Sequence, residues 1–195
     1  MRLVLASASP RRAQILRQLG VAFEVQVSDV DEALLPGESG EAAALRLARS
    51  KAEWVAARTT LPVLAADTLV LCDGAVLGKP ESPGDAARML AGLAGRRHEV
   101  VTGVCLLAGG RAASGLERTG VLLAALSLPQ IEWYVGTGEP LDKAGAYHVD
   151  GRGALFIRGV DGSPSNVAGL PVALVYRLAA ELGLELGWPL PPRQA

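Results

Sequence analysis

The chain is poor in cysteine and histidine, and both shortages limit what it can be. Two cysteines and two histidines occur among 195 residues. Cys72 and Cys105 lie in apolar segments without Cys-x-x-Cys spacing, so we expect reduced core residues and not disulfides or zinc ligands. His98 and His148 share no ligand spacing, which argues against a histidine-based metal site.

The sequence also lacks an excess of charge of one sign and a long hydrophobic run. Nineteen Lys and Arg balance twenty Asp and Glu, and no basic run is longer than a pair. Broad nucleic-acid binding is therefore not expected, and a polyanion would have to be held locally. The apolar N-terminal run is broken by Ser7, Ser9 and Arg11, so it is too short for a signal peptide or a membrane span. We expect a cytoplasmic protein that binds neither nucleic acid nor membrane.

Half of the residues are hydrophobic, enough for one α/β domain or for two lobes that share a sheet. Hydrophobic periodicity and turn residues predict strands at 3–6, 21–27, 62–71, 75–77, 100–108, 116–126 and 154–160. They predict helices at 10–19, 40–58, 83–94, 127–135 and 171–182, and a functional loop at 136–153. No repeat or domain boundary is evident, so residues 1–195 are treated as one domain with a loosely packed tail at 187–195.

The most informative segment joins the first strand to the first helix. Two hydroxyls, Ser7 and Ser9, precede Pro10, which suits the first position of a helix whose free N–H groups can bind an anion. Arg11 and Arg12 add two planar cations at the same place. The segment predicts a phosphate site, although Ser9 alone could be a simple helix cap and the arginines a solvated first turn.

Four further charged residues are candidates for chemistry. Lys51 falls on the apolar stripe of the 40–58 helix, where it is either functional or snorkels to solvent. Asp67 follows four apolar residues and is placed at the end of a buried strand, as a metal ligand, a general base or a structural ion pair. Lys79 and Glu32 lie in a turn and an acidic loop, where either could also be an ordinary surface charge.

Motifs for several other chemistries are missing. Neither Gly-x-Ser-x-Gly nor Gly-x-x-x-x-Gly-Lys-[Ser/Thr] occurs, and Ser7 and Ser9 have no histidine at motif spacing. Nucleophilic serine catalysis and the P-loop kinase and GTPase mechanisms are therefore not expected.

Taken together, eight segments resemble the Maf-like nucleoside triphosphate pyrophosphatases over nearly the whole chain. Each is weak alone, but their joint order and spacing are specific. The segments are Ser7-Ala8-Ser9-Pro10-Arg11-Arg12, Asp31-Glu32, Arg46-Leu47-Ala48-Arg49-Ser50-Lys51-Ala52, Ala66-Asp67-Thr68, Gly78-Lys79-Pro80, Thr102-Gly103-Val104, Glu139-Pro140-Leu141-Asp142-Lys143-Ala144-Gly145-Ala146-Tyr147 and Val167-Ala168-Gly169-Leu170-Pro171.

The resemblance implies an α/β fold with a bent mixed sheet flanked by helices, in two lobes with a central cleft. It implies hydrolysis of a nucleoside triphosphate between the α and β phosphates, with Mg²⁺ or Mn²⁺ as the divalent cation. By resemblance, Asp67 is the catalytic proton acceptor, and Arg11, Lys51 and Lys79 hold phosphates together with Ser7 and Ser9. Glu32 and Asp67 are the expected metal ligands.

The resemblance also bears on base choice, and here the chain departs from the pattern. Arg12 and Thr68 match the branch that acts on dTTP and UTP. Where that branch has Ile-Gln-Gly, this chain has Val149-Asp150-Gly151, so a carboxylate that only accepts hydrogen bonds replaces an amide that also donates them. The Asp142-Lys143 pair is expected near the same cleft.

Two other functions remain open at this stage. One is a broader house-cleaning pyrophosphatase for modified nucleotides, which the change at Asp150 would suit. The other is a nucleotide-binding regulator of septum formation without turnover. A homodimer is also an open expectation.

Overall fold

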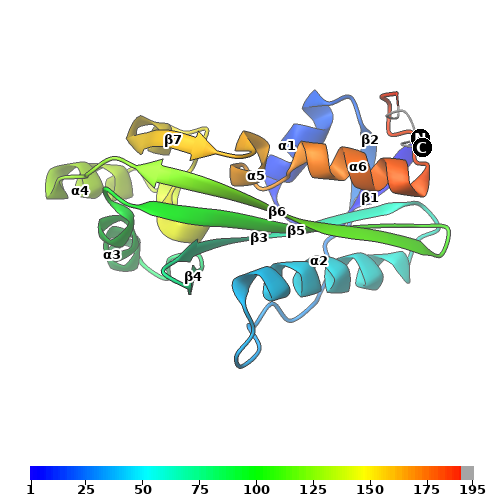
Figure 1. Ribbon diagram of the computed structural model, residues 1–195, viewed down its shortest axis with the longest axis horizontal. Coiled ribbons are helices and arrows are strands. Elements are labelled where there is room, and N and C mark those ends of the chain that lie inside the picture. The colour runs from blue at the N-terminus through cyan, green and yellow to red at the C-terminus, as the bar shows by residue number, and fades with distance from the viewer. Residues whose placement is uncertain (190–195) are drawn as a thin grey trace. The chain divides into compact units, whose positions relative to one another are not determined.

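A mixed seven-stranded sheet flanked by helices forms the framework of the protein, as expected (Figure 1). The computed structural model describes residues 1–189. The strand order is β2-β1-β3-β5-β6-β7, with β4 paired to β3. The strands are β1 (Arg2–Leu5), β2 (Ala22–Val25), β3 (Val63–Cys72), β4 (Ala75–Leu77), β5 (Arg97–Ala108), β6 (Arg111–Leu123) and β7 (Ile157–Asp161).

Within residues 1–189, six α-helices and three short 3₁₀ helices accompany the strands. They are α1 (Pro10–Gln18), α2 (Gly40–Ala56), α3 (Pro83–Leu93), α4 (Leu128–Gly136), η1 (Glu139–Asp142), η2 (Ala144–Ala146), η3 (Arg152–Phe156), α5 (Pro164–Val167) and α6 (Val172–Leu182). The predicted tail at 187–195 falls mostly on residues 190–195, which lie outside the described residues.

Contacts within the chain define two compact units, each of which is described by itself. The first contains Met1–Asp67, Thr102–Glu117 and the segment from Gly169 onward. The second contains Thr68–Val101 and Arg118–Ala168.

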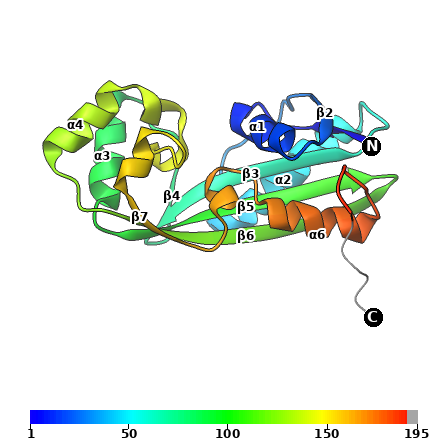
Figure 2. The same ribbon diagram turned by 90° about the horizontal axis from the view of Figure 1, so that it is seen from above.

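In the first unit, α2 lies on one face of the strands, and α1 and α6 lie on the other (Figures 1 and 2). β1 is central there, because it pairs in parallel with β2 on one side and with β3 on the other. A buried apolar cluster joins α2 to the strands. It contains Val4, Ala6, Ala48, Ala52, Val55, Val63, Ala65 and Cys105.

Helix α2 begins and packs for reasons visible in the sequence. The Ser39 hydroxyl accepts a hydrogen bond from the backbone N–H of Ala42 at 3.2 Å and caps the helix. The predicted apolar stripe is buried along its whole length, including Lys51. Gly103 of β5 allows the close approach, because a Cβ there would lie 2.2 Å from the carbonyl oxygen of Ala44. The Thr102-Gly103-Val104 segment thus permits the short packing distance between α2 and the sheet.

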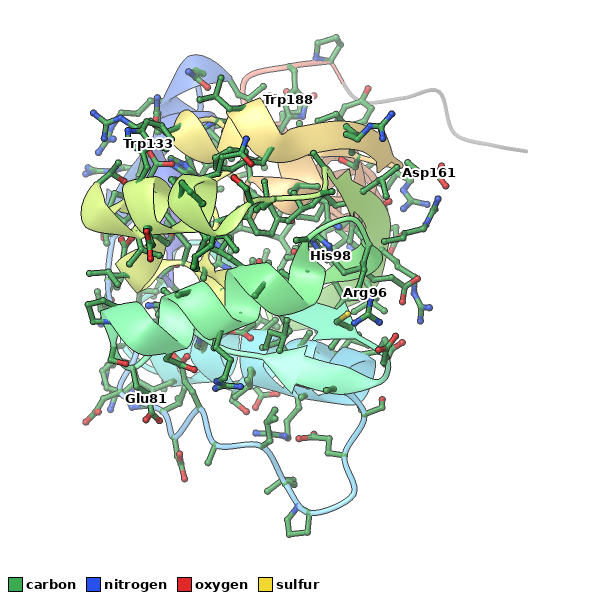
Figure 3. The ribbon with its side chains drawn as sticks, turned by 90° about the vertical axis from the view of Figure 1, so that its left-hand side faces the viewer. Glu81, Arg96, His98, Trp133, Asp161 and Trp188 are labelled. Atoms are coloured by element: carbon green, nitrogen blue, oxygen red, sulfur yellow. The ribbon has the colours of Figure 1, made fainter. Side chains whose placement is uncertain are left out.

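In the second unit, α3 and α4 lie side by side (Figure 2) and share an apolar core with the strands. Ser82 caps α3 as expected, with its hydroxyl 3.1 Å from the backbone nitrogen of Asp85. His98 lies in the interior and is 2% exposed, whereas Trp133 on α4 lies at the surface (Figure 3). The core of this unit is rich in aromatic residues, among them Tyr134, Tyr147 and Phe156.

Three strand predictions were wrong by three or more residues at one or both ends, and the first is β5, which begins at Arg97 where residue 100 was expected. β6 begins at Arg111 and ends at Leu123, where residues 116–126 were expected. It continues directly from the turn at Gly109-Gly110, and its small and polar first residues conceal the strand from the hydrophobic pattern. The strand expected at 154–160 begins only at Ile157, because Arg152–Phe156 forms the 3₁₀ helix η3. The four-residue helix α5 was not predicted.

Candidate active site

The first unit brings Lys51, Asp67 and Glu32 together. The ammonium Nζ of Lys51 lies 2.6 Å from Oδ1 of Asp67 and 2.7 Å from Oε1 of Glu32. The side chains of Lys51 and Asp67 are 8% and 9% exposed, whereas that of Glu32 is 61% exposed. One buried cation is therefore shared by a buried carboxylate and a carboxylate that reaches solvent.

The pairing of Lys51 with Asp67 follows from strand alternation. Val63 and Ala65 of β3 pack in the cluster beneath α2. Side chains two residues apart on a strand point to the same face, so Asp67 points toward α2 as well. Lys51 lies on the buried stripe of α2, and the two charges meet.

The expectation that Asp67 ends a strand was wrong, because Asp67 is the fifth residue of the ten-residue strand β3. The strand that ends near Asp67 is the neighbouring strand β1. β1 pairs with β3 only through Val4 and Leu5, which lie opposite Val63 and Leu64. β3 continues because it still has a partner on its other side, so Asp67 lies beyond the carboxyl end of β1. That edge is where open α/β sheets bind ligands.

The turn from β1 to α1 is built as the sequence predicts. Ser9 caps α1, and its hydroxyl accepts from the backbone N–H of Arg12 at 3.4 Å. The Ser7 hydroxyl is buried and accepts from the backbone N–H of Ser9 at 3.2 Å. Pro10 occupies the first helical position. The two hydroxyls thus organise the turn itself.

Arg11 and Arg12 diverge although they are adjacent. Arg12 is buried; its Nη1 donates to the Ser7 hydroxyl at 2.9 Å and its Nε to the carbonyl oxygen of Gly169 at 2.8 Å. Burial lowers the pKa of the Arg12 guanidinium, although the charges of Asp67 and Glu32 oppose this shift. Arg11 is only partly buried, and its Nη1 donates to Oε1 of Gln14 at 2.8 Å.

A second ion pair holds the loop that carries Glu32. Arg46 on α2 donates from Nε and Nη2 to the two carboxylate oxygens of Glu38, both at 2.7 Å. Nη2 also donates to the carbonyl oxygen of Ala33 at 3.0 Å. Oε2 of Glu38 accepts from the backbone N–H of Leu35 at 3.2 Å. We call this Arg46–Glu38 pair the loop clamp, because it ties residues 33–38 to the helix that bears Lys51.

The second unit joins two other predicted segments. The backbone N–H of Gly145 donates to the carbonyl oxygen of Gly78 at 3.1 Å. Nζ of Lys143 lies 2.5 Å from Oδ1 of Asp142. This hydrogen bond is the main cause that lowers the pKa of Asp142, and the charge of Lys79 contributes in the same direction. The Gly78-Lys79-Pro80 turn and the segment from Asp142 to Gly145 therefore contact each other through the backbone hydrogen bond between Gly145 and Gly78.

The two remaining specificity candidates also belong to the second unit. Thr68 follows Asp67 on β3 and is partly buried. Asp150 is exposed, in the segment from His148 to Gly153. Backbone N–H groups of that segment donate hydrogen bonds to Glu139 and Tyr134, two residues for which the sequence predicted no role.

The donor set at Lys51 suits a hard cation such as Mg²⁺. Two carboxylates, those of Glu32 and Asp67, converge on one point, and Mg²⁺ usually takes one or two protein carboxylates together with substrate phosphates. Within residues 1–189, no group of three or more His, Cys, Asp and Glu side chains could hold a metal ion. A cage made by the described protein residues alone is therefore not present.

Two expectations about the rest of the chain can be compared with the structure. Cys72 and Cys105 are both free thiols, as predicted. None of the helices in the described part of the chain has the length and apolar character that a membrane crossing requires.

The loop clamp and the Glu139–Tyr134 contacts were missed for a common reason. Arg46 and Glu139 both lie in segments that carry the family resemblance, so a signal existed. Their partners, however, are eight and five residues away across loops, and hydrogen bonds made through loop geometry leave no periodic pattern.

Comparison with solved structures finds matches of low similarity. A Ham1 protein from Coxiella burnetii matches with a TM-score of 0.46 and 19% identity, over 65% of this chain and 74% of that chain. A dITP/XTP pyrophosphatase from Mycobacterium abscessus matches with a TM-score of 0.40 and 21% identity, over the same shares.

Sequence comparison gives much stronger matches. The dTTP/UTP pyrophosphatase of Anaeromyxobacter dehalogenans strain 2CP-C is 51% identical over 195 residues, covering 97% of this chain and 98% of the relative. The dTTP/UTP pyrophosphatase of Moorella thermoacetica is 51% identical, covering 95% and 97%. The family model described as Maf-like protein matches residues 2–182. The chain belongs to the Maf-like protein family.

Proposed function

We propose that the protein hydrolyses nucleoside triphosphates between the α and β phosphates, with a preference for dTTP and UTP. The observation that carries this proposal is the buried pair of Lys51 and Asp67, with Glu32 on the same ammonium. It lies beyond the carboxyl end of β1, beside the helix N-terminus that the sequence predicts as an anion site. Relatives about half identical over nearly their whole length carry the name of this activity.

Asp67 is the proton acceptor in this proposal. A water molecule attacks the α-phosphorus, its proton passes to the Asp67 carboxylate, and the bond from the α-phosphorus to the bridging oxygen breaks. The products are a nucleoside monophosphate and pyrophosphate. A fixed carboxylate both orients water and takes its proton, which makes a poor nucleophile effective. Lys51 holds that carboxylate in place by its hydrogen bond.

Cationic and hydroxyl groups bind the phosphates. Ser7 and Ser9 lie in the turn before α1, Arg11 lies in the first turn of α1, and Lys51 provides an ammonium from α2. Such groups offset the charge that develops on the leaving pyrophosphate. Lys79 is proposed to bind phosphate, as the resemblance predicts, and Asp142 and Lys143, which form an ion pair, are proposed to serve the same substrate.

Glu32 and Asp67 would hold the divalent cation, Mg²⁺ or Mn²⁺. When bound, the cation supplies charge neutralisation on the phosphates and lowers the pKa of coordinated water. The carboxylate of Glu32 reaches solvent and would remain accessible to such a cation. Lys51 holds Asp67 and would also face the phosphates.

Arg12, Thr68 and Asp150 are the proposed base-specificity residues. Arg12 and Thr68 match the dTTP and UTP branch, whereas Asp150 replaces its glutamine. This one departure favours a second candidate, a broader pyrophosphatase that also removes modified nucleotides. We also propose a cytoplasmic location, which the free thiols of Cys72 and Cys105 support.

A pyrophosphate-release assay across a nucleotide panel tests these functions. The panel contains dTTP, UTP, the other canonical triphosphates and base-modified pyrimidine triphosphates, each with Mg²⁺ or Mn²⁺. We expect pyrophosphate and the monophosphate in equal amounts, with dTTP and UTP turned over fastest. A flat profile would favour the broader pyrophosphatase. Nucleotide binding without pyrophosphate release would instead support a regulator without turnover.

A further inference from the structure

We propose that Glu139 and Tyr134 are positioning residues that hold the His148–Gly153 segment, and with it Asp150, in the place that sets base preference. This inference rests on the proposed function and goes further, because it names residues that act on specificity without contact with the base. All of these residues belong to the second unit.

The Glu139 carboxylate accepts three hydrogen bonds, two of them from the segment it holds. Oε2 accepts from the backbone N–H of Arg152 at 3.0 Å, and Oε1 accepts from that of Gly153 at 3.0 Å. Oε1 also accepts from the hydroxyl of Tyr134 at 2.8 Å. Burial alone would raise the pKa of Glu139, but these donors outweigh it and lower the pKa on balance. The carboxylate is thus kept ionised as an acceptor for the segment.

Tyr134 holds the other end of the segment. Its hydroxyl accepts from the backbone N–H of His148 at 3.0 Å while it donates to Glu139. The tyrosine is fully buried on α4, and its ring packs edge-on against Phe156 with the centroids 5.4 Å apart. A phenol fixed in this way cannot follow a moving loop, so His148 is tied to the core.

Two glycines show how closely the segment approaches these side chains. A Cβ on Gly151 would lie 2.5 Å from Oε2 of Glu139. A Cβ on Gly153 would lie 2.6 Å from the Tyr134 hydroxyl and 2.6 Å from the carbonyl oxygen of His148. Neither position has room for a side chain, so the backbone on both sides of Asp150 rests directly on the two positioning residues.

The bonds bracket Asp150 along the chain. His148 is anchored two residues before it, and Arg152 and Gly153 are anchored two and three residues after it. A short segment held at both ends leaves its exposed middle residue little freedom. A displacement of about 1 Å in a substrate-positioning group can cost up to about a hundredfold in rate, so this fixation bears directly on discrimination.

The test compares Glu139→Ala, Glu139→Gln and Tyr134→Phe with a matched control, Glu132→Ala. Glu132 is an exposed glutamate on α4, in the same part of the chain. The first readout is the ratio of kcat/KM for dTTP to kcat/KM for dATP. We expect Glu139→Ala to lower this ratio roughly tenfold, mainly through the KM for dTTP. Glu139→Gln should lie between it and the wild type, because its carbonyl oxygen can still accept from Gly153.

A glycine pair gives an independent version of the test. Gly153→Ala should reproduce the loss of discrimination, whereas Gly159→Ala should not, because a Cβ at Gly159 meets no atom within 4 Å. The second readout is amide hydrogen exchange, which should become faster at Arg152 and Gly153 in the Glu139 variants while exchange in α3 is unchanged.

The outcomes separate this inference from the proposed function. Faster exchange at Arg152 and Gly153 with an unchanged dTTP to dATP ratio would overturn the inference, as would an equal loss of kcat for both nucleotides. A wild type that releases pyrophosphate from no nucleotide would overturn the proposed function instead. The positioning role would then be judged by the ratio of Kd values for dTTP and dATP in the same variants.

Discussion

The ammonium of Lys51 and the carboxylate of Asp67 lie 2.6 Å apart, and both side chains are more than nine-tenths buried. Ionised groups in such a place are rarely left without a partner, because burial of a lone charge is expensive. Glu32 binds the same ammonium with a side chain that is 61% exposed, so the ion pair reaches solvent through Glu32. In the proposed function, this ion pair is also where the triphosphate binds.

Asp67→Asn tests the proton acceptor. The amide is nearly the same size but cannot take a proton from water, so we expect kcat to fall by about two to four orders of magnitude. Circular dichroism should show an unchanged fold. Hydrolysis near the wild-type rate would contradict the assignment.

Lys51→Met tests how much the Lys51–Asp67 ion pair contributes to the free energy of unfolding. Removal of the ammonium leaves the Asp67 carboxylate buried, and the loss of one partner of a buried pair typically costs 3–5 kcal/mol. We expect the free energy of unfolding to fall by about 3 kcal/mol, the lower end of this range, because the charge of Arg12 still acts on Asp67. Urea denaturation measures this. The double variant Lys51→Met/Asp67→Leu should recover much of the loss, and a double variant less stable than Lys51→Met would refute the explanation.

Arg46→Ala tests the loop clamp. The substitution removes the bidentate contact to Glu38 and the bond to the Ala33 carbonyl, so the loop that carries Glu32 loses its tie to α2. Loss of a residue that holds a metal ligand in place commonly costs 10- to 100-fold in metal affinity or activity. We expect the Mg²⁺ concentration needed for half-maximal activity to rise about tenfold. Arg49→Ala on the same helix, where the side chain reaches Ser114, is the control. Equal effects of the two substitutions would argue against a specific clamp.

Asp150→Gln tests the departure from the dTTP and UTP branch. The amide restores a hydrogen-bond donor that a carboxylate lacks, so the preference for dTTP and UTP should sharpen. The nucleotide panel described above measures it, with Asp161→Asn on β7 as a control for loss of charge. A substrate profile identical to the wild type would show that Asp150 makes no base contact.

The burial of His98 should make the free energy of unfolding depend on pH. Burial lowers the pKa of His98 from 6.5 to about 4, and its Nε2 lies 2.8 Å from the Tyr147 hydroxyl. Between pH 6.5 and about 4 the unfolded chain binds a proton that the folded chain does not, so stability falls as the pH falls through this window. The difference amounts to about 3 kcal/mol. His98→Gln should flatten this part of the curve, whereas His148→Gln should leave it in place.

Much of the fold could be predicted from the sequence, because local rules decide it. Ser39 and Ser82 cap their helices through bonds to backbone N–H groups three residues away, and Asp73-Gly74 forms the turn between β3 and β4 with both residues at positive φ. The stripe on α2 was predicted together with Lys51. The predictions failed where tertiary contacts replace local preference, as at η3, whose first amides bind the carboxylate of Glu139.

The sequence by itself therefore determined the elements, the residues available for chemistry and the family resemblance. The periodicity of hydrophobic residues and the capping of helices depend on only a few neighbouring residues, and the order of motifs is visible in the sequence itself. Only the tertiary structure decided that β1 ends before it reaches Asp67, that Lys51 is shared by two carboxylates, and that Arg12 turns inward while Arg11 does not. These facts depend on where one strand ends relative to its neighbour in the sheet and on contacts between segments far apart in the chain. No local sequence pattern encodes such contacts.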